Sequence, residues 1–213
     1  TRMNPLSVYV AMFDGALGTP RRIWATLRDC MMLLCIGVGL APAFKMRFWN
    51  CGAEGQVLLG AIATAACMIY LGGAGIPNVL LLIIMAVCSI LAGALWGVIP
   101  AVFKAKWNSN ETLFTLMMNY VAIQLTSFCV SLWENPPNSN TVGVINQGTK
   151  AGWFPSLDGL SYSYWLNLIL VVLVAVFMFL YLRYTKQGYE IAVVGDSENT
   201  ARYAGIRVGR VYI

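Results

Sequence analysis

The chain has 213 residues, of which 59% are hydrophobic and only 11% are charged, and its mean hydropathy is +0.68. A soluble domain carries about 25% charged residues, so this composition excludes a soluble globular domain. The net charge of +5 does not indicate a nucleic-acid partner, because an excess of Lys and Arg is normal in the cytoplasmic loops of membrane proteins.

Five apolar segments approach or exceed the roughly 20 residues that an α-helix needs to cross a bilayer. They cover residues 23–44, 57–76, 79–103, 112–133 and 164–182. The sequence therefore predicts an all-α fold, a polytopic membrane bundle with about five transmembrane helices. We expect residues 1–213 to belong to a single transmembrane domain.

The stretches around these spans also carry information. Residues 1–22 mix apolar residues with Gly and Pro, which is typical of a short helix at the membrane surface. Only Pro77-Asn78 separates the second span from the third, which predicts a tight antiparallel hairpin of helices. Gly93 and Gly97 have the small-xxx-small spacing that lets helices approach closely, and we expect this contact to lie within the chain.

The distribution of Lys and Arg predicts the orientation of the chain. The loops at residues 45–56, 104–111 and 183–213 carry nine basic residues, whereas the opposite side carries five. The positive-inside rule therefore places the first three loops in the cytoplasm and the long loop at residues 134–163 outside.

A polar, glycine-broken run at residues 48–56 separates the first two spans. It contains Glu54, and an ionisable group within a membrane is a functional candidate because a charge at the bilayer centre costs roughly 2.5–3.5 kcal/mol. Gly52 and Gly55 let the backbone leave helical geometry, which membranes tolerate only inside protein or beside a water-filled cavity. Two interpretations stay open: an element that lines a transport path, or a cytoplasmic turn in which Glu54 caps the next helix.

Few other polar side chains lie in or beside the spans. Asn119 and Gln124 lie inside the fourth span, where each can hydrogen-bond between helices or face a central passage. The candidates for a solute path are Asn50, Glu54, Gln56 and Asn119.

Residues 183–213 are amphipathic and charged, and they contain a predicted short helix. Asp196 or Ser197 can cap its start, Arg202 lies near its end, and Gly205 can stop it. Such a helix can dock in a groove of a cytoplasmic partner, or it can be an ordinary surface helix.

Several kinds of chemistry are disfavoured. The chain has no G-x-x-x-x-G-K-[ST] phosphate-binding loop, so it cannot hydrolyse a nucleotide by that route. It has no histidine, which disfavours a zinc site and excludes Ser/His and Cys/His catalytic pairs. The six cysteines form no C-x-x-C pair and are expected to be buried free thiols. We therefore expect neither enzymatic activity nor a metal site in this chain.

Three motifs resemble one known family. Residues 50–61, N-C-G-A-E-G-Q-V-L-L-G-A, closely resemble the N-I-G-A-E-G-Q-x-L-x-G-A element of bacterial ABC importer permeases, in the branch for nucleosides and ribose-type sugars. Residues 110–122 look like its N-E-V-x-x-T-L-M-L-N-Y-I-A stretch, and residues 201–206 match its A-R-Y-A-G-I segment. The resemblance covers roughly residues 33–206. Ala192 and Ser197 depart from it, since the family favours Arg and Asn there.

The resemblance implies a multi-pass subunit of the bacterial inner membrane with about ten spans in the full chain. It implies a second permease chain, cytoplasmic ABC ATPase subunits and an extracytoplasmic solute-binding lipoprotein as partners, with ATP used by the ATPases rather than by this chain. The residues expected to transmit ATPase movement are Gly195, Asp196, Ala201, Arg202, Tyr203 and Gly205. Because the chain starts at Thr1 and its last residues read as the beginning of another element, we expect a fragment of a longer protein.

The solute and the energy source leave alternatives. Nucleosides are the first expectation, and riboflavin or simple sugars are the alternatives within the same architecture. A secondary carrier or channel driven by an ion gradient is a further alternative, and an intramembrane enzyme is disfavoured because no nucleophile–base or metal constellation occurs.

Overall fold

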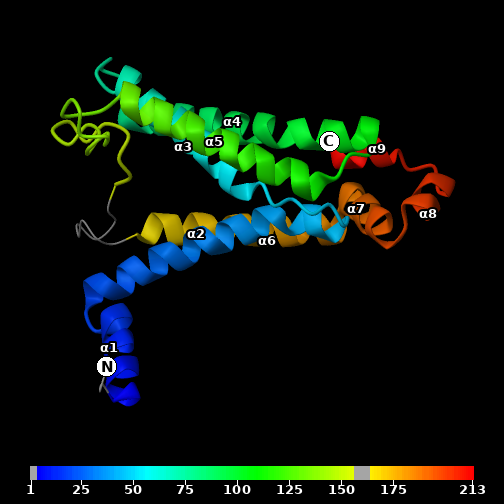
Figure 1. The fold of residues 1–213 in the computed structure, drawn as a ribbon, viewed down its shortest axis with the longest axis horizontal. Coiled ribbons are helices and arrows are strands. Elements are labelled where there is room, and N and C mark those ends of the chain that lie inside the picture. The colour runs from blue at the N-terminus through cyan, green and yellow to red at the C-terminus, as the bar shows by residue number, and fades with distance from the viewer. Residues whose placement is uncertain (1–3, 156–163) are drawn as a thin grey trace. The chain divides into compact units, whose positions relative to one another are not determined.

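The computed structural model describes residues 4–155 and 164–213, and within them every regular element is a helix (Figure 1). The helices are α1 (Pro5–Leu17), α2 (Pro20–Lys45), α3 (Ala53–Leu71), α4 (Asn78–Trp107), α5 (Glu111–Leu132), α6 (Trp165–Tyr184), α7 (Lys186–Asp196), α8 (Glu198–Tyr203) and α9 (Val208–Tyr212). The helices α2 to α6 are long and apolar enough to cross a membrane. The predicted all-α bundle with five spans is confirmed. Residues 156–163 of the predicted outer loop lie outside the described part.

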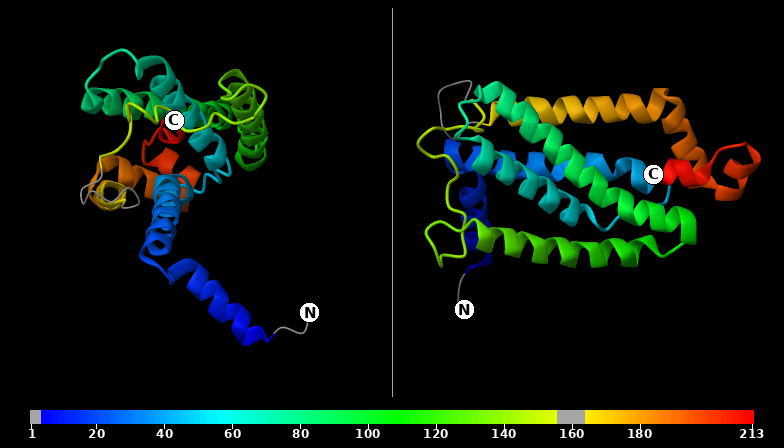
Figure 2. Two further views of the ribbon diagram at one scale, coloured as in Figure 1. Left: turned by 90° about the vertical axis from the view of Figure 1, so that its left-hand side faces the viewer. Right: turned by 90° about the horizontal axis from the view of Figure 1, so that it is seen from above.

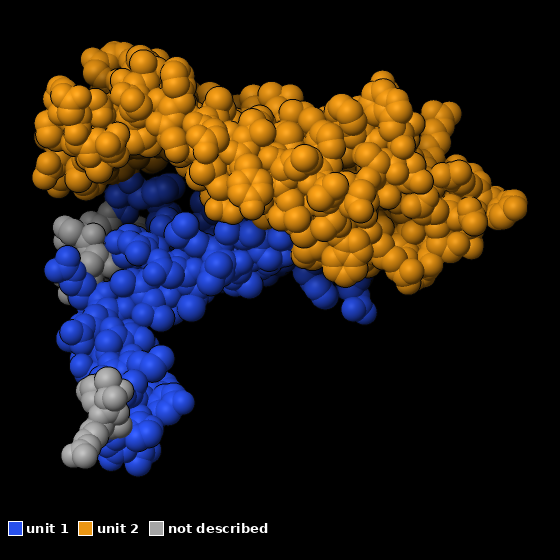
Figure 3. Space-filling model, viewed as in Figure 1, with its two compact units in different colours: residues 1–41, 154–185 blue, residues 42–153, 186–213 orange. Residues whose placement is uncertain are grey.

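The chain forms two compact units, coloured separately in Figure 3. The first unit comprises residues 1–41 and 154–185, and the second comprises residues 42–153 and 186–213. The candidate residues for a solute path and for coupling all lie in the second unit.

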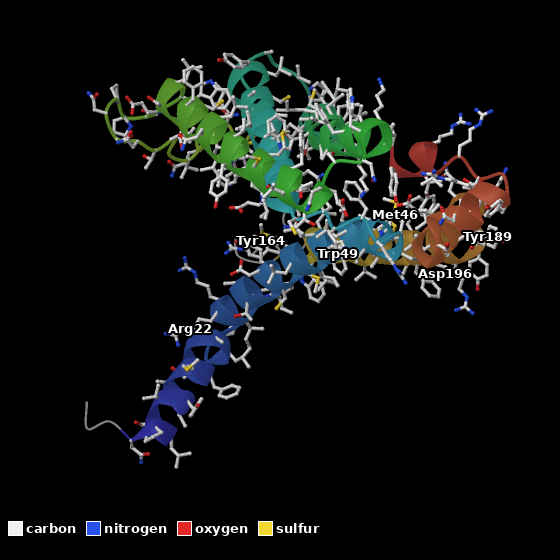
Figure 4. The ribbon with its side chains drawn as sticks, turned by 45° about the vertical axis from the view of Figure 1, so that its right-hand side comes forward. Arg22, Met46, Trp49, Tyr164, Tyr189 and Asp196 are labelled. Atoms are coloured by element: carbon white, nitrogen blue, oxygen red, sulfur yellow. The ribbon has the colours of Figure 1, made fainter. Side chains whose placement is uncertain are left out.

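In the first unit, aromatic and ionic contacts join α1, α2 and α6. The short helix expected before the first span is present as α1. Arg22 of α2 pairs with Asp14 of α1 at 3.2 Å. The rings of Trp24 and Trp165 meet edge to face with their centroids 4.9 Å apart. Tyr164, which precedes α6, lies under the Arg28 guanidinium. Figure 4 labels Arg22 and Tyr164.

In the second unit, α3 packs against both α4 and α5 (Figures 1 and 2). The small residues of α4 explain how closely α3 approaches. A Cβ atom at Gly97 would lie 2.5 Å from the Nε2 of Gln56, and one at Gly93 would lie 3.3 Å from the Gln56 carbonyl oxygen. The spacing of these glycines therefore serves a contact within the chain, as predicted.

The predicted two-residue turn between the second and third spans is wrong. α3 ends at Leu71, and residues 72–77 connect it to α4. The glycines in this connection end the helix although hydropathy stays high, and Gly75 adopts a positive φ of 70° that favours glycine. Asn78 binds the loop after α5, because its Nδ2 donates to the Trp153 carbonyl at 3.0 Å and its Oδ1 accepts from the Gly152 N–H at 2.7 Å.

The three basic loops meet at one end of the second unit. Met46 follows α2, Lys104 lies in the last turn of α4, and Tyr212 lies in α9, yet all three line one cavity. The opposite end holds the 72–77 connection and the loop after α5. Hydropathy and charge therefore grouped these loops correctly.

Candidate functional site

The polar run at residues 48–56 begins as an ordered loop between α2 and α3. α2 ends at Lys45, and Arg47 adopts a left-handed φ of 58° that turns the chain. Met46 and Phe48 are buried, and so is Asn50, whose Oδ1 accepts from the Gly52 N–H at 2.9 Å. Asn50 thus orders the backbone directly before α3.

α3 begins without a side-chain cap of its own. Gly52 occupies the capping position and has no side chain to accept a hydrogen bond, so the first N–H groups of α3 need other partners. Glu54 lies in the first turn, where the positive end of the helix dipole favours a carboxylate.

Two buried side chains of α5 bind this helix start. The Oδ1 of Asn119 accepts from the Gly55 N–H at 2.9 Å, and its Nδ2 donates to the Cys51 carbonyl at 2.8 Å. The Oγ1 of Thr115 accepts from the Cys51 N–H at 3.1 Å and donates to the Glu111 carbonyl at 2.8 Å. A hydrogen bond contributes about 0.5–1.5 kcal/mol net, so these contacts hold the break firmly against α5.

The glycines of the break allow this close approach. A Cβ atom at Gly55 would lie 2.9 Å from both the Asn119 Oδ1 and the Trp96 Nε1, and one at Gly52 would lie 3.0 Å from the Thr115 Cβ. A larger residue at either position would therefore push α3 away from α4 or α5.

Three polar groups near the start of α3 have no partner among the described residues. The Glu54 carboxylate is exposed and makes no hydrogen bond or ion pair there. The Gln56 side-chain amide lies against Gly97 of α4 and makes no hydrogen bond with any described residue. The Trp96 Nε1–H is shielded from solvent and has no acceptor in the part of the chain that the structure describes. The four predicted path residues therefore divide into Asn50 and Asn119, which bind the backbone, and Glu54 and Gln56, which do not.

Sequence reasoning missed Thr115 and Trp96. Thr115, Asn119 and Ala122 form a buried stripe at helical spacing on α5, and this periodicity was the available signal for Thr115. Trp96 lies between the two glycines of the small-xxx-small motif, and nothing in the sequence indicates the direction of its N–H.

The segment after α6 contains three helices where one was predicted. α7 and α9 are the helices that sequence reasoning missed, and α8 is capped as predicted by Ser197, whose Oγ accepts from the Thr200 N–H at 3.3 Å. Gly205 follows α8 with a positive φ of 79°, as expected of a residue that stops a helix.

The predicted coupling residues occupy distinct environments. Gly195 is buried where α7 crosses the end of α2, and a Cβ atom there would overlap the Lys45 carbonyl oxygen. Ala201 is fully buried, whereas Tyr203 is 93% exposed. Arg202 is exposed and lies 3.6 Å from Glu198 on the same helix. Asp196, the last residue of α7, is also exposed. Arg202 and Tyr203 therefore place a polar and an aromatic group of α8 on the surface of the second unit.

A hydrogen bond joins α8 to α9, and an ion pair joins the end of α4 to the start of α5. The Tyr212 hydroxyl donates to the Glu198 Oε1 at 2.6 Å, and burial, together with this hydrogen bond, raises the pKa of the Tyr212 phenol. The Lys104 Nζ lies 2.9 Å from the Glu111 Oε2, and both side chains are largely buried. Burial makes such a pair costly to break from one side.

Lys104, Glu198 and Tyr212 line a cavity of about 180 Å³. The rest of its lining is Met46, Arg47 and residues 194–197, and Figure 4 shows Met46 and Asp196 near each other. The arrangement connects α7 and α8 to the loop that precedes α3.

A family profile described as "Branched-chain amino acid transport system / permease component" matches residues 22–213. The chain is 31% identical over 95% of its length to the guanosine ABC transporter permease protein NupP of Bacillus subtilis and 28% identical over 99% to the nucleoside ABC transporter permease protein NupB of Lactococcus lactis. It is 30% identical over 99% of its length to the glucose ABC transporter permease protein TsgB13 of Haloferax volcanii.

The chain spans 57%, 59% and 57% of the length of these three relatives, respectively. Their names describe transport permeases, which is a non-enzymatic role. No solved structure matches the chain at a significant level.

Proposed function

The chain belongs to the family of permease components of branched-chain amino acid transport systems, and from this premise we propose that it forms a large part of the membrane subunit of an ATP-binding-cassette importer for nucleosides. Two of the three relatives are named for guanosine or nucleoside transport, which supports this solute. The relative named for glucose supports a simple sugar as the second candidate.

The observation that carries the proposal is the polar break at the start of α3. Asn119 and Thr115 hold it inside the bundle by hydrogen bonds to the backbone, and Glu54 and Gln56 retain free hydrogen-bonding capacity beside it. Polar groups without partners are energetically unfavourable in a membrane-spanning bundle, and binding of a polar solute during transport explains why they are present.

The proposed path residues have different roles. Asn50 and Asn119 position the break, whereas Glu54 and Gln56 face the solute. The Glu54 carboxylate can accept hydrogen bonds from the ribose hydroxyls of a nucleoside, and the Gln56 amide can donate and accept. Trp96 can donate its N–H to a carbonyl or ring nitrogen of the base when α3 moves from its side.

The energy source in this proposal lies in other chains. The sequence has no phosphate-binding loop, so ATP is used by cytoplasmic ATPase subunits, and an extracytoplasmic lipoprotein delivers the solute to a pair of permease chains. Closure of the ATPases on ATP moves α8. The contact between Gly195 and Lys45 then passes the movement to the loop before α3, which shifts between two discrete packings.

The test is ATP hydrolysis by the complete importer, reconstituted in liposomes with its binding protein and scanned over nucleosides, glucose and riboflavin. Stimulation by nucleosides supports the proposal. Stimulation by glucose alone would replace the nucleoside with a sugar, and a rate that no solute changes would contradict the proposed function.

A further inference from the structure

A second concave surface lies between α7 and the chain that leads into α9. It has a volume of about 410 Å³ and is lined by Lys186, Tyr189 and Glu190 of α7, by the turn at residues 204–206, and by Arg207 and Arg210. We refer to it as the basic groove. It is distinct from the cavity beside Met46, because the two share no lining residue.

The basic groove carries an excess of positive charge. Lys186 lies 3.8 Å from Glu190 and is 89% exposed, so this pair neutralises little of the groove. Arg207 and Arg210 make no ion pair or side-chain hydrogen bond with any residue that the structure describes. Two guanidinium groups are therefore available, and guanidinium binds phosphate oxygens through paired N–H donors.

The groove also lies close to the membrane along the chain. α6 ends at Tyr184, and Lys186 follows two residues later, so at most about 7 Å of extended chain separates the end of the span from this lining residue. Tyr189 at its edge is 66% exposed, and aromatic residues with polar tips favour the membrane–water interface. The cytoplasmic leaflet carries anionic lipids that attract basic segments next to spans.

We propose that the basic groove binds the phosphate of an anionic phospholipid headgroup and so attaches the coupling segment to the membrane surface. A lipid fits better than an acidic segment of an ATPase, because Tyr203, the most exposed large hydrophobic side chain of this segment, does not line the groove. A protein partner has that surface of α8 available instead. The proposal requires residues 186–213 to lie on the cytoplasmic side of the membrane, and it does not depend on which solute the importer carries.

The experiment uses the complete importer with its full-length permease, assembled in nanodiscs that contain phosphatidylcholine with or without phosphatidylglycerol. Bound phosphatidylglycerol is counted by mass spectrometry after detergent extraction, for the wild type and for Arg207→Gln and Arg210→Gln, alone and combined. Arg202→Gln is the matched control, because Arg202 pairs with Glu198 and does not line the groove. Arg207→Lys tests whether charge alone is sufficient.

We expect the combined variant to lose about fivefold or more of the retained phosphatidylglycerol and Arg202→Gln to retain it, with the Lys variant between them because it keeps charge without the paired donors. Equal retention by all variants would overturn the proposal. Loss of the ATPase subunits with unchanged lipid would also overturn it, in favour of a protein partner. Displacement of the lipid by millimolar inorganic phosphate at constant ionic strength would instead indicate a site for the free anion. If the combined variant fails to assemble, the single variants decide by the same criteria.

Discussion

The backbone N–H of Gly55 donates to the Oδ1 of Asn119 across 2.9 Å, so one apolar helix fixes the first turn of its neighbour. The Nδ2 of the same Asn119 side chain donates to the Cys51 carbonyl at 2.8 Å. A single buried side chain thus supplies both a donor and an acceptor to a helix start that has no cap of its own. This relationship explains how a polar break remains ordered between apolar helices.

Removal of the Asn119 amide should therefore destabilise the fold. In Asn119→Ala the Gly55 N–H and the Cys51 carbonyl lose their partner, and each unpaired buried group costs about 1–3 kcal/mol. We expect a lower midpoint of thermal unfolding in detergent, measured by tryptophan fluorescence. Gln124→Ala is the control, since Gln124 is exposed on the same helix and makes no hydrogen bond with a described residue. Equal midpoints for both variants would argue against the bridging role of Asn119.

Glu54 should affect transport more than folding. Its carboxylate has no partner among the described residues, so Glu54→Gln removes charge without breaking an ion pair. We expect membrane expression to stay normal and nucleoside uptake to fall about tenfold, the equivalent of roughly 1.4 kcal/mol of lost solute interaction. Uptake in cells that lack other nucleoside carriers is the measurement, with Glu54→Asp, which keeps the charge, as the control. Unchanged uptake would leave Glu54 with only a favourable position at the helix start.

We expect the close contact at Gly195 to transmit movement from α7 to the end of α2. A Cβ atom there overlaps the Lys45 carbonyl oxygen, so Gly195→Ala must separate α7 from the end of α2. We expect ATP hydrolysis to continue while the nucleoside no longer stimulates it. Gly209→Ala in α9 is the control, because its new Cβ atom would meet Ala105 at an ordinary 3.6 Å. Normal stimulation in Gly195→Ala would contradict this route of transmission.

The charge distribution predicts which loop faces outward. In a permease without native cysteines, Thr149→Cys on the exposed loop after α5 should react with a membrane-impermeant maleimide in intact cells. Restoring Cys51 alone should give labelling only after permeabilisation, since it lies in the predicted cytoplasmic loop and is exposed. The reverse pattern would invert the orientation.

Some of this arrangement was predictable from sequence, and the rest depends on packing. Hydropathy located the five spans because length and apolar content alone decide whether a helix can cross a bilayer. It placed the end of α3 too late, because Gly72 and Gly73 stop the helix while the sequence stays apolar. Glu54 and Gln56 were visible as polar residues in an apolar context.

Thr115 and Trp96 were not visible in this way. A threonine in a membrane helix usually bonds to its own backbone, so its second bond to Cys51 requires α3 and α5 to meet in this register. The unpaired N–H of Trp96 depends on how closely α3 lies against α4. The segment after α6 was predictable only in part. Its capping residues predicted α8, but the need for a glycine at position 195 follows only from the packing of α7 against the end of α2.

The most direct measurement for the whole account is uptake of a radiolabelled nucleoside by liposomes that contain the full-length permease, with and without its ATPase subunits. We predict ATP-dependent uptake when the ATPases and the binding protein are present, and none when the permease is alone. Uptake by the permease alone, driven by an ion gradient, would contradict the account and identify a secondary carrier.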